Sequence, residues 1–136
     1  MGEHPVSAED RQAILDLCAA YNWRTDTGDA RGVAALFTPD GAWDGPPGRY
    51  EGTDAIVEFN ERIHELIRGA MHFNDNHQFE GDGDRIRHRC SSALHIPSEG
   101  GVQIQLMTYE DTLVQVDGAW RFAERINRNF DPAAFR

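Results

Sequence analysis

The chain has 136 residues, of which 40% are hydrophobic and 26% charged, so we expect a single domain over 1–136 with its core at about 8–129. Thirteen basic and twenty-three acidic side chains give a formal net charge of −10, which disfavours nucleic acid and anionic membranes as partners. Cys18 and Cys90 lack CxxC spacing, and neither a signal-peptide pattern nor a long apolar run occurs. We therefore expect a cytoplasmic protein with two buried thiols.

The first forty residues predict a helical hairpin. Ser7 to Asp10 resembles a capping box, and apolar side chains then recur at helical spacing, which predicts a helix over about 8–27. Gly28 is placed to end it, and Asp29 is placed to cap a short second helix. We expect that second helix to run through Phe37 and to stop at 38–41.

A third helix is predicted after a short strand and an irregular loop over 41–52. Thr53 is expected to cap it, and its apolar stripe runs from Ile56 to Ile67 before Gly69. Beyond that glycine the pattern alternates with period two, which predicts antiparallel strands over about 71–80, 85–96, 102–116 and 119–129. Three helices followed by a four-stranded meander indicate an α+β domain with a pocket between helices and sheet.

Asp26 is an unusual residue for its place. It lies in the last turn of the first predicted helix, where the helix dipole disfavours a carboxylate by roughly 0.3 to 1 kcal/mol. Asn22 and Asp26 stack along one edge of the apolar face, so the carboxylate points half inward. Two interpretations stay open: it bonds backbone amides at the helix end, or it pairs with a donor such as an imidazole on the sheet.

The six histidines are separated by position and strand parity. We expect His4 and His64 to be solvated. Odd spacing puts His77 on the face opposite His72, and His95 on the face opposite His88, unless a bulge intervenes. No metal site is therefore expected, since a site would need ligands from different strands.

Other polar side chains allow two interpretations each. Asn74 and Asn76 share the predicted face of His72, which suits either a pocket or the surface of an open sheet. On residue type alone, Tyr109 suits a core aromatic and Arg125 a surface ion pair.

The order of these motifs resembles the SnoaL-like branch of the nuclear transport factor 2-like superfamily over about 8–129. The likeness is carried by Tyr21-x4-Asp26-Thr27-Gly28-Asp29, Ala35-Leu36-Phe37-Thr38-Pro39-Asp40-Gly41, Gly52-x3-Ile56, Met71-His72-x3-Asn76, Asp82-Gly83-Asp84 and Asp117-Gly118-Ala119-Trp120-Arg121-Phe122. It implies a cone-shaped, curved antiparallel sheet packed against three N-terminal helices, a fold also called cystatin-like.

The resemblance also implies a site. In the dehydratases and the dehydrochlorinase of this superfamily a helix Asp and a strand His form a catalytic dyad, and the matching positions are Asp26 and His72. By the same likeness Tyr21, His95 and Arg125 are expected to bind substrate.

There are two departures from those relatives. His95 replaces an Asp of the bile-acid dehydratase, and Met107 and Tyr109 replace polar residues of scytalone dehydratase. Tyr109 is our further candidate for substrate binding, and the substrate is left open.

The implied activity is that of a cofactor-independent lyase of the dehydratase type. His72 would remove a proton from a carbon next to a carbonyl or ring, with Asp26 fixing the imidazole. A polyketide cyclase or ketosteroid-type isomerase is the runner-up, and non-catalytic binding of small molecules is a third interpretation. An epoxide hydrolase ranks lowest, because only one inward carboxylate is evident.

The expected partners are a small hydrophobic, oxygenated molecule and further copies of the chain, as a dimer or trimer. No nucleic acid, membrane, metal or organic cofactor is expected.

Overall fold

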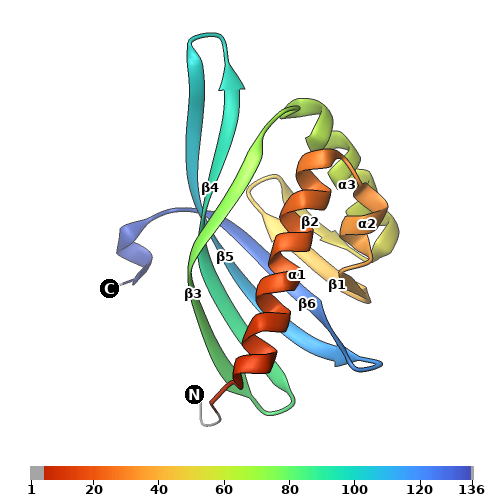
Figure 1. The fold of residues 1–136 in the computed structure, drawn as a ribbon. Coiled ribbons are helices and arrows are strands. Elements are labelled where there is room, and N and C mark those ends of the chain that lie inside the picture. The colour runs from red at the N-terminus through yellow and green to blue at the C-terminus, as the bar shows by residue number, and fades with distance from the viewer. Residues whose placement is uncertain (1–4, 136) are drawn as a thin grey trace.

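The computed structural model describes residues 5–135, which place three α-helices on one side of a curved six-stranded sheet (Figure 1). The helices are α1 (Ala8–Thr27), α2 (Ala30–Ala34) and α3 (Thr53–Leu66). The strands are β1 (Phe37–Gly45), β2 (Gly48–Glu51), β3 (Met71–Asp82), β4 (Arg85–Ser98), β5 (Gly101–Val116) and β6 (Ala119–Asn129), and a 3-10 helix, η1 (Pro132–Phe135), follows. The predicted fold class, α+β with a curved sheet against three N-terminal helices, is confirmed.

Helix α1 begins and ends where its capping residues predict. The Ser7 hydroxyl accepts from the Asp10 backbone N–H at 3.0 Å. At the other end Gly28 has a φ of 83°, and the Asp29 backbone N–H donates to the Arg24 carbonyl at 2.8 Å. This Schellman arrangement fixes the end of the helix, and with it the position of Asp26 in the last turn.

The predicted second helix is too long. Helix α2 ends at Ala34, and Phe37 begins strand β1 instead of extending the helix. The cause is tertiary pairing, because β1 runs parallel to β6 with Phe37 opposite Phe122. The register shifts between Phe37 and Ala42, and Pro39, which cannot donate to a ladder, lies exposed in that irregular stretch.

The start of helix α3 also differs from the prediction. The N-cap residue is Gly52, at a φ of 87°, and no side chain caps the helix. Thr53 is instead the first helical residue. A backbone with positive φ before the helix suits glycine, so the turn geometry decides the position of the cap.

The sheet has the order β2-β1-β6-β5-β4-β3. Its four long strands, β3 to β6, are antiparallel to one another, and their bounds differ from the predicted ones by at most two residues. The short strands β1 and β2 extend this meander at the β6 edge. Because β1 is parallel to β6, the sheet is mixed rather than purely antiparallel.

A β-bulge interrupts β3 and reverses the predicted parity of its second half. The pairing of β3 with β4 shifts between Asp75 and Gln78, and Asn76 takes a φ of 57° within the shift. His77 therefore joins His72 on the inner face, toward the helices. Asn76, predicted on that face, turns outward and donates to the Ser91 hydroxyl at 2.9 Å.

The interior holds two separate hydrophobic clusters. The large cluster joins α1, α2, α3 and the lower sheet and includes Ile14, Tyr21, Phe37, Trp43, Cys90, Tyr109 and Phe122. The small cluster consists of Ala70, Leu94 and Met107, with Ile67 and Ile96 packed against them. Along the inner face of β4, Ser92 lies between Cys90 of the large cluster and Leu94 of the small one. A layer with polar side chains, here called the polar level and including Ser92, thus separates the two clusters.

Replacing Gly28 should destabilise the protein, because its conformation and its surroundings both exclude a side chain. In Gly28→Ala a Cβ would lie 2.8 Å from His64 Nε2 at a φ of 83°. Gly83→Ala is the matched control, with a φ of 66° and no atom within 4 Å of the added Cβ. We expect about 1 to 2 kcal/mol for the control from backbone strain and a larger loss for Gly28→Ala, measured by urea unfolding. Equal losses would show that the His64 contact contributes nothing.

Candidate active site

The carboxylate of Asp26 and the imidazole of His72 join the end of α1 to the start of β3. His72 Nδ1 lies 2.6 Å from Asp26 Oδ1, and the His72 backbone N–H donates to Oδ2 at 3.0 Å. Only 6% of the His72 side chain and 9% of the Asp26 side chain are exposed. An ionised carboxylate only accepts hydrogen bonds, so the neutral ring carries its hydrogen on Nδ1. Nε2 then holds a lone pair and has no hydrogen-bond partner among residues 5–135.

Unpaired polar side chains gather at the level of this dyad. Asn74 lies two residues after His72 on the inner face of β3, directly opposite Ser92 of β4. Asn22 lies one helical turn before Asp26 on α1. The Asn22 Oδ1, both side-chain polar atoms of Asn74 and the Ser92 hydroxyl are buried without a partner in the described part of the chain. Such groups are costly in a core, which makes this level suited to a ligand with oxygen atoms.

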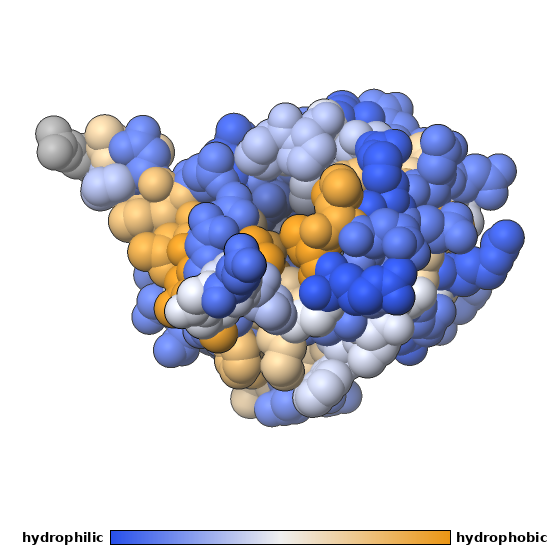
Figure 2. Space-filling view, turned by 90° about the horizontal axis from the view of Figure 1, so that it is seen from above, coloured by the Kyte–Doolittle hydropathy of each residue, from blue (hydrophilic) through white to orange (hydrophobic). Residues whose placement is uncertain are grey.

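The small cluster adjoins the dyad. Leu94 is the residue directly opposite His72 in the β3–β4 ladder, and both side chains face inward. Seen from the end of the molecule where these residues lie, hydrophobic side chains occupy the middle of a hollowed surface bordered by hydrophilic ones (Figure 2). The small cluster thus lies beside the dyad on the inner face of the sheet.

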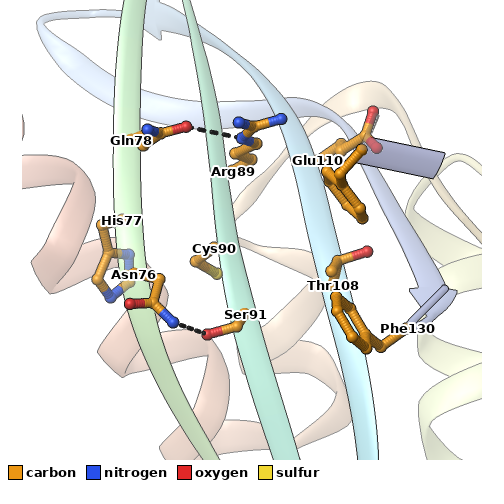
Figure 3. Close-up of a pocket in the computed structure, with 10 residues that line it drawn as sticks. Asn76, His77, Gln78, Arg89, Cys90, Ser91, Thr108, Glu110 and Phe130 are labelled. Carbon is orange, nitrogen blue, oxygen red and sulfur yellow. Dashed lines mark hydrogen bonds between the residues drawn. The ribbon is translucent and has the colours of Figure 1, made fainter. Parts of the chain in front are cut away.

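Four pockets of the structure lie away from the dyad. Three, of 470, 960 and 570 Å³, are lined mainly by residues of the sheet, and Phe135 of the C-terminal segment contributes to each. The fourth, of 290 Å³, lies between α2, β1 and α3. Neither Asp26 nor His72 lines any of these four. The close-up of the 470 Å³ pocket shows Asn76 and Gln78 reaching from β3 to Ser91 and Arg89 of β4 (Figure 3).

Three of the predicted substrate-binding residues form one buried group. The Arg125 guanidinium is fully buried and lies over the rings of Tyr109, Tyr21 and Phe122 at 3.7, 4.2 and 4.7 Å from their centroids. The Tyr21 hydroxyl accepts from Trp43 Nε1 at 3.0 Å. Arg125 is thus a core cation rather than a surface residue. A substrate contact for Tyr21, Tyr109 or Arg125 stays a prediction, since within 5–135 no hydrogen bond joins them to the dyad.

The structure does not bring His95 to the dyad. His95 is paired with Met71, whereas Leu94 is paired with the inward-facing His72. His95 therefore lies on the outer face of the sheet. Its ring there contacts the ring of Phe73, with 4.7 Å between the centroids. The expectation that His95 faces the pocket is therefore wrong, and the alternation of side chains along β4 is the reason. His64 is half-buried against Gly28 rather than fully solvated, and His4 lies outside the described residues.

A second polar chain crosses the interior below the dyad, and sequence reasoning missed it. His77 Nδ1 lies 2.9 Å from His88 Nε2, and His88 Nδ1 lies 2.8 Å from Asp111 Oδ2. Arg125 Nε lies 3.2 Å from the other oxygen of Asp111. Asp111 is thus a second inward carboxylate, where only one was expected. Asn76 is the one local sign of the bulge, because asparagine tolerates a positive φ. Whether a bulge forms at that residue depends, however, on how β3 pairs with the neighbouring strand.

Burial sets the protonation of several groups in this region. It lowers the pKa of His77, helped by the neighbouring His88, so the ring stays neutral to lower pH. Burial raises the pKa of Cys18 to about 12 and that of Cys90 to about 11, against the opposing effect of Arg125. Both are free thiols, as expected. Burial opposes the charge of Arg125, but Asp111 together with Cys18, Tyr109 and Tyr21 outweighs it, and the pKa of Arg125 is raised.

The fold and the inner-face dyad define the class of the protein: a nuclear transport factor 2-like domain with a cystatin-like fold. The model of the SnoaL-like domain matches residues 6–126, so the chain belongs to the SnoaL-like domain family. Comparison with curated proteins gives no match. No helix among the described residues is long and apolar enough to span a membrane.

Three solved structures show the likeness in detail. A variant of a function-unknown protein from Mycobacterium tuberculosis is 30% identical with a TM-score of 0.83, and the match covers 93% of this chain and 78% of that one. An NTF2-like protein with a cystatin-like fold from Novosphingobium aromaticivorans is 26% identical with a TM-score of 0.82, covering 93% and 86%. A proposed scytalone dehydratase from the same species is 27% identical with a TM-score of 0.80, covering 90% and 85%.

Proposed function

We propose that the protein is a cofactor-independent lyase of the dehydratase type. The observation that carries the proposal is the 2.6 Å contact between His72 Nδ1 and Asp26 Oδ1, in a nearly buried pair whose remaining nitrogen has no protein partner within 5–135. A helix-end carboxylate serving only to end α1 would bond the amides of its own turn. Asp26 instead accepts two hydrogen bonds from one residue of the sheet, an arrangement that orients an imidazole.

The proposed first step is proton abstraction by His72. Nε2 removes a proton from a carbon next to a carbonyl, and the electrons of that C–H bond pass into the conjugated system. Asp26 stabilises the imidazolium that forms and holds the ring through both of its oxygens. General acid–base assistance of this kind contributes roughly 10² to 10⁴ in rate.

The second step returns the proton. The C–O bond to a β-hydroxyl breaks, the Nε2–H proton passes to the departing oxygen, and the products are water and an unsaturated carbonyl compound. In this mechanism Asn22, Asn74 and Ser92 hydrogen-bond the oxygens of the substrate, because their buried polar atoms lie at the level of the dyad. His95 has no part, since it lies on the outer face of the sheet.

The same first step also serves an isomerase or a cyclase. Double-bond migration returns the proton to another carbon, and ring closure directs the carbanion at a second carbonyl. The products distinguish these reactions, because only the lyase releases water. A protein that merely binds small molecules would need no oriented imidazole beside an ionised carboxylate.

We further propose that copies of the chain associate through the outer face of the sheet. Exposed hydrophobic side chains gather there on β3 and β5: Met71, Phe73, Val102, Ile104 and Leu106. The dyad lies on the inner face and is complete within one chain, so association is not needed to assemble it.

Loss of either dyad residue should remove most of the activity. We expect Asp26→Asn and His72→Gln to lower kcat/KM at least about 10²-fold, because the base loses its orientation or its nitrogen. The assay follows loss of water by mass spectrometry over a panel of hydrophobic β-hydroxy ketones. His95→Gln, a histidine of the outer face, is the matched control and should retain activity. Full turnover in Asp26→Asn would remove the dyad from the mechanism.

Shortening Leu94 should open space beside the base, because that side chain is directly opposite His72. We expect Leu94→Ala to lower KM for bulky substrates while costing about 2 to 5 kcal/mol of stability, measured by denaturant unfolding. Val116→Ala, an exposed valine at the end of β5 that belongs neither to the small cluster nor to the proposed association surface, is the control and should change neither quantity. An unchanged substrate range in a folded Leu94→Ala variant would contradict access past the small cluster.

A further inference from the structure

Three side chains that commonly bind metal ions converge on the inner face of the sheet, beyond the dyad. His88 and Cys90 are two residues apart on β4 and face the same way, and the bulge in β3 brings His77 beside them. His77 Nδ1, His88 Nε2 and Cys90 Sγ all lie within 4.8 Å of one another. Ligands around a tetrahedral ion with bonds of about 2.0 to 2.3 Å are separated by less than this, so small side-chain shifts suffice.

The His88 imidazole is already oriented for a ligand. Its Nδ1 lies 2.8 Å from Asp111 Oδ2, so Nδ1 carries the hydrogen and Nε2 presents its lone pair toward His77. Carboxylate, histidine and metal in this order form the usual outer support of a bound zinc ion. Asp111 is itself fixed by Arg125, whose Nε lies 3.2 Å from its second oxygen.

The three residues also line pockets that open to solvent. His77 and Cys90 line the 470 Å³ pocket, and His77 and His88 line the 960 Å³ pocket, although His88 and Cys90 are themselves buried. Inner-face residues reach these pockets next to the register break between Asp75 and Gln78, where the β3–β4 ladder is interrupted.

We propose that His77 Nδ1, His88 Nε2 and Cys90 Sγ bind a divalent zinc-type ion, with Asp111 as the support of His88. Two imidazoles and one thiolate suit borderline-soft Zn²⁺ and disfavour Mg²⁺ or Ca²⁺, which prefer oxygen ligands. On binding, the hydrogen of His77 moves from Nδ1 to Nε2, and the Cys90 thiol releases its proton to solvent. The fourth ligand position is left for a solvent molecule from the pocket.

This site is separate from the dyad. His77 follows His72 by five residues of β3, which corresponds to roughly 15 Å along a strand. The hydrogen-bond chain through His88 ends at Asp111, which forms an ion pair with Arg125, while His72 bonds Asp26. The proposal therefore stands or fails independently of the lyase activity.

The test is a titration of the tag-free, chelator-treated protein with Co²⁺, followed by competition with Zn²⁺. We expect one ion per chain and a thiolate-to-cobalt charge-transfer absorption, which requires Cys90 as a ligand. His77→Ala and Cys90→Ser should each weaken Zn²⁺ binding at least about 100-fold, more than the loss of an outer-shell partner. Thermal unfolding of each variant without metal shows whether it is folded, and His77→Ala, at a half-buried edge position, is the variant least dependent on the core.

Two controls make the result specific to these three residues. His95→Ala removes a histidine of the outer face, and Cys18→Ser removes the thiol that also lies near His88 and Asp111. Both should keep the wild-type affinity. The proposal is overturned if the wild-type chain binds neither ion, if binding persists in His77→Ala and Cys90→Ser, or if Cys18→Ser abolishes it instead.

Discussion

The contact between Asp26 and His72 holds the end of α1 against the start of β3, and the proposed chemistry depends on it. A carboxylate in the last helical turn is opposed by the helix dipole and by burial. Two hydrogen bonds from one residue offset these costs, one from the His72 backbone and one from its ring. The first fixes the carboxylate and the second fixes the imidazole. The same interaction thus joins α1 to β3 and orients the proposed base.

The interior is divided by polarity into levels with different roles. The large cluster fills the lower part with aromatic rings around the Arg125 cation, which Asp111 neutralises. Removing either partner of this buried ion pair would leave an uncompensated charge. The pair therefore has to stay intact for the fold to be stable. The dyad level holds uncharged buried polar atoms without protein partners in the described chain, whereas the unpartnered nitrogens of Arg125 lie over aromatic rings. A substrate with oxygens can satisfy those atoms, whereas an aliphatic residue cannot.

Most elements can be predicted from local pattern, whereas the pairing of Asp26 with His72 is implied only by the resemblance to the superfamily. Helix caps, period-two strands and the odd position of Asp26 can be recognised within a few neighbouring residues. The bulge at Asn76 could not be placed, because it depends on how β3 pairs with β4, and one inserted residue reverses the face of every side chain that follows. Parity alone therefore puts His77 on the face opposite His72, whereas the bulge turns it inward.

The dependence on strand pairing also explains why the strand beginning at Phe37 and the inward position of Asp111 are not predicted. Phe37 begins a strand because β6, about 85 residues further along the chain, is available as a parallel partner. Asp111 lies in a strand whose sequence gives no sign that an arginine and a histidine face it from both neighbouring strands. Both features are tertiary, and neither leaves a local pattern in the residues that form it.

The tautomer of the His72 imidazole tests the central claim most directly. It is measured from the ¹⁵N chemical shifts of the ring in histidine-labelled protein, with the His72→Gln variant identifying the signal. The account predicts a neutral ring protonated on Nδ1 with an unprotonated Nε2, and a change in this state in Asp26→Asn. A ring protonated on Nε2, as in free histidine, and insensitive to Asp26→Asn would contradict it.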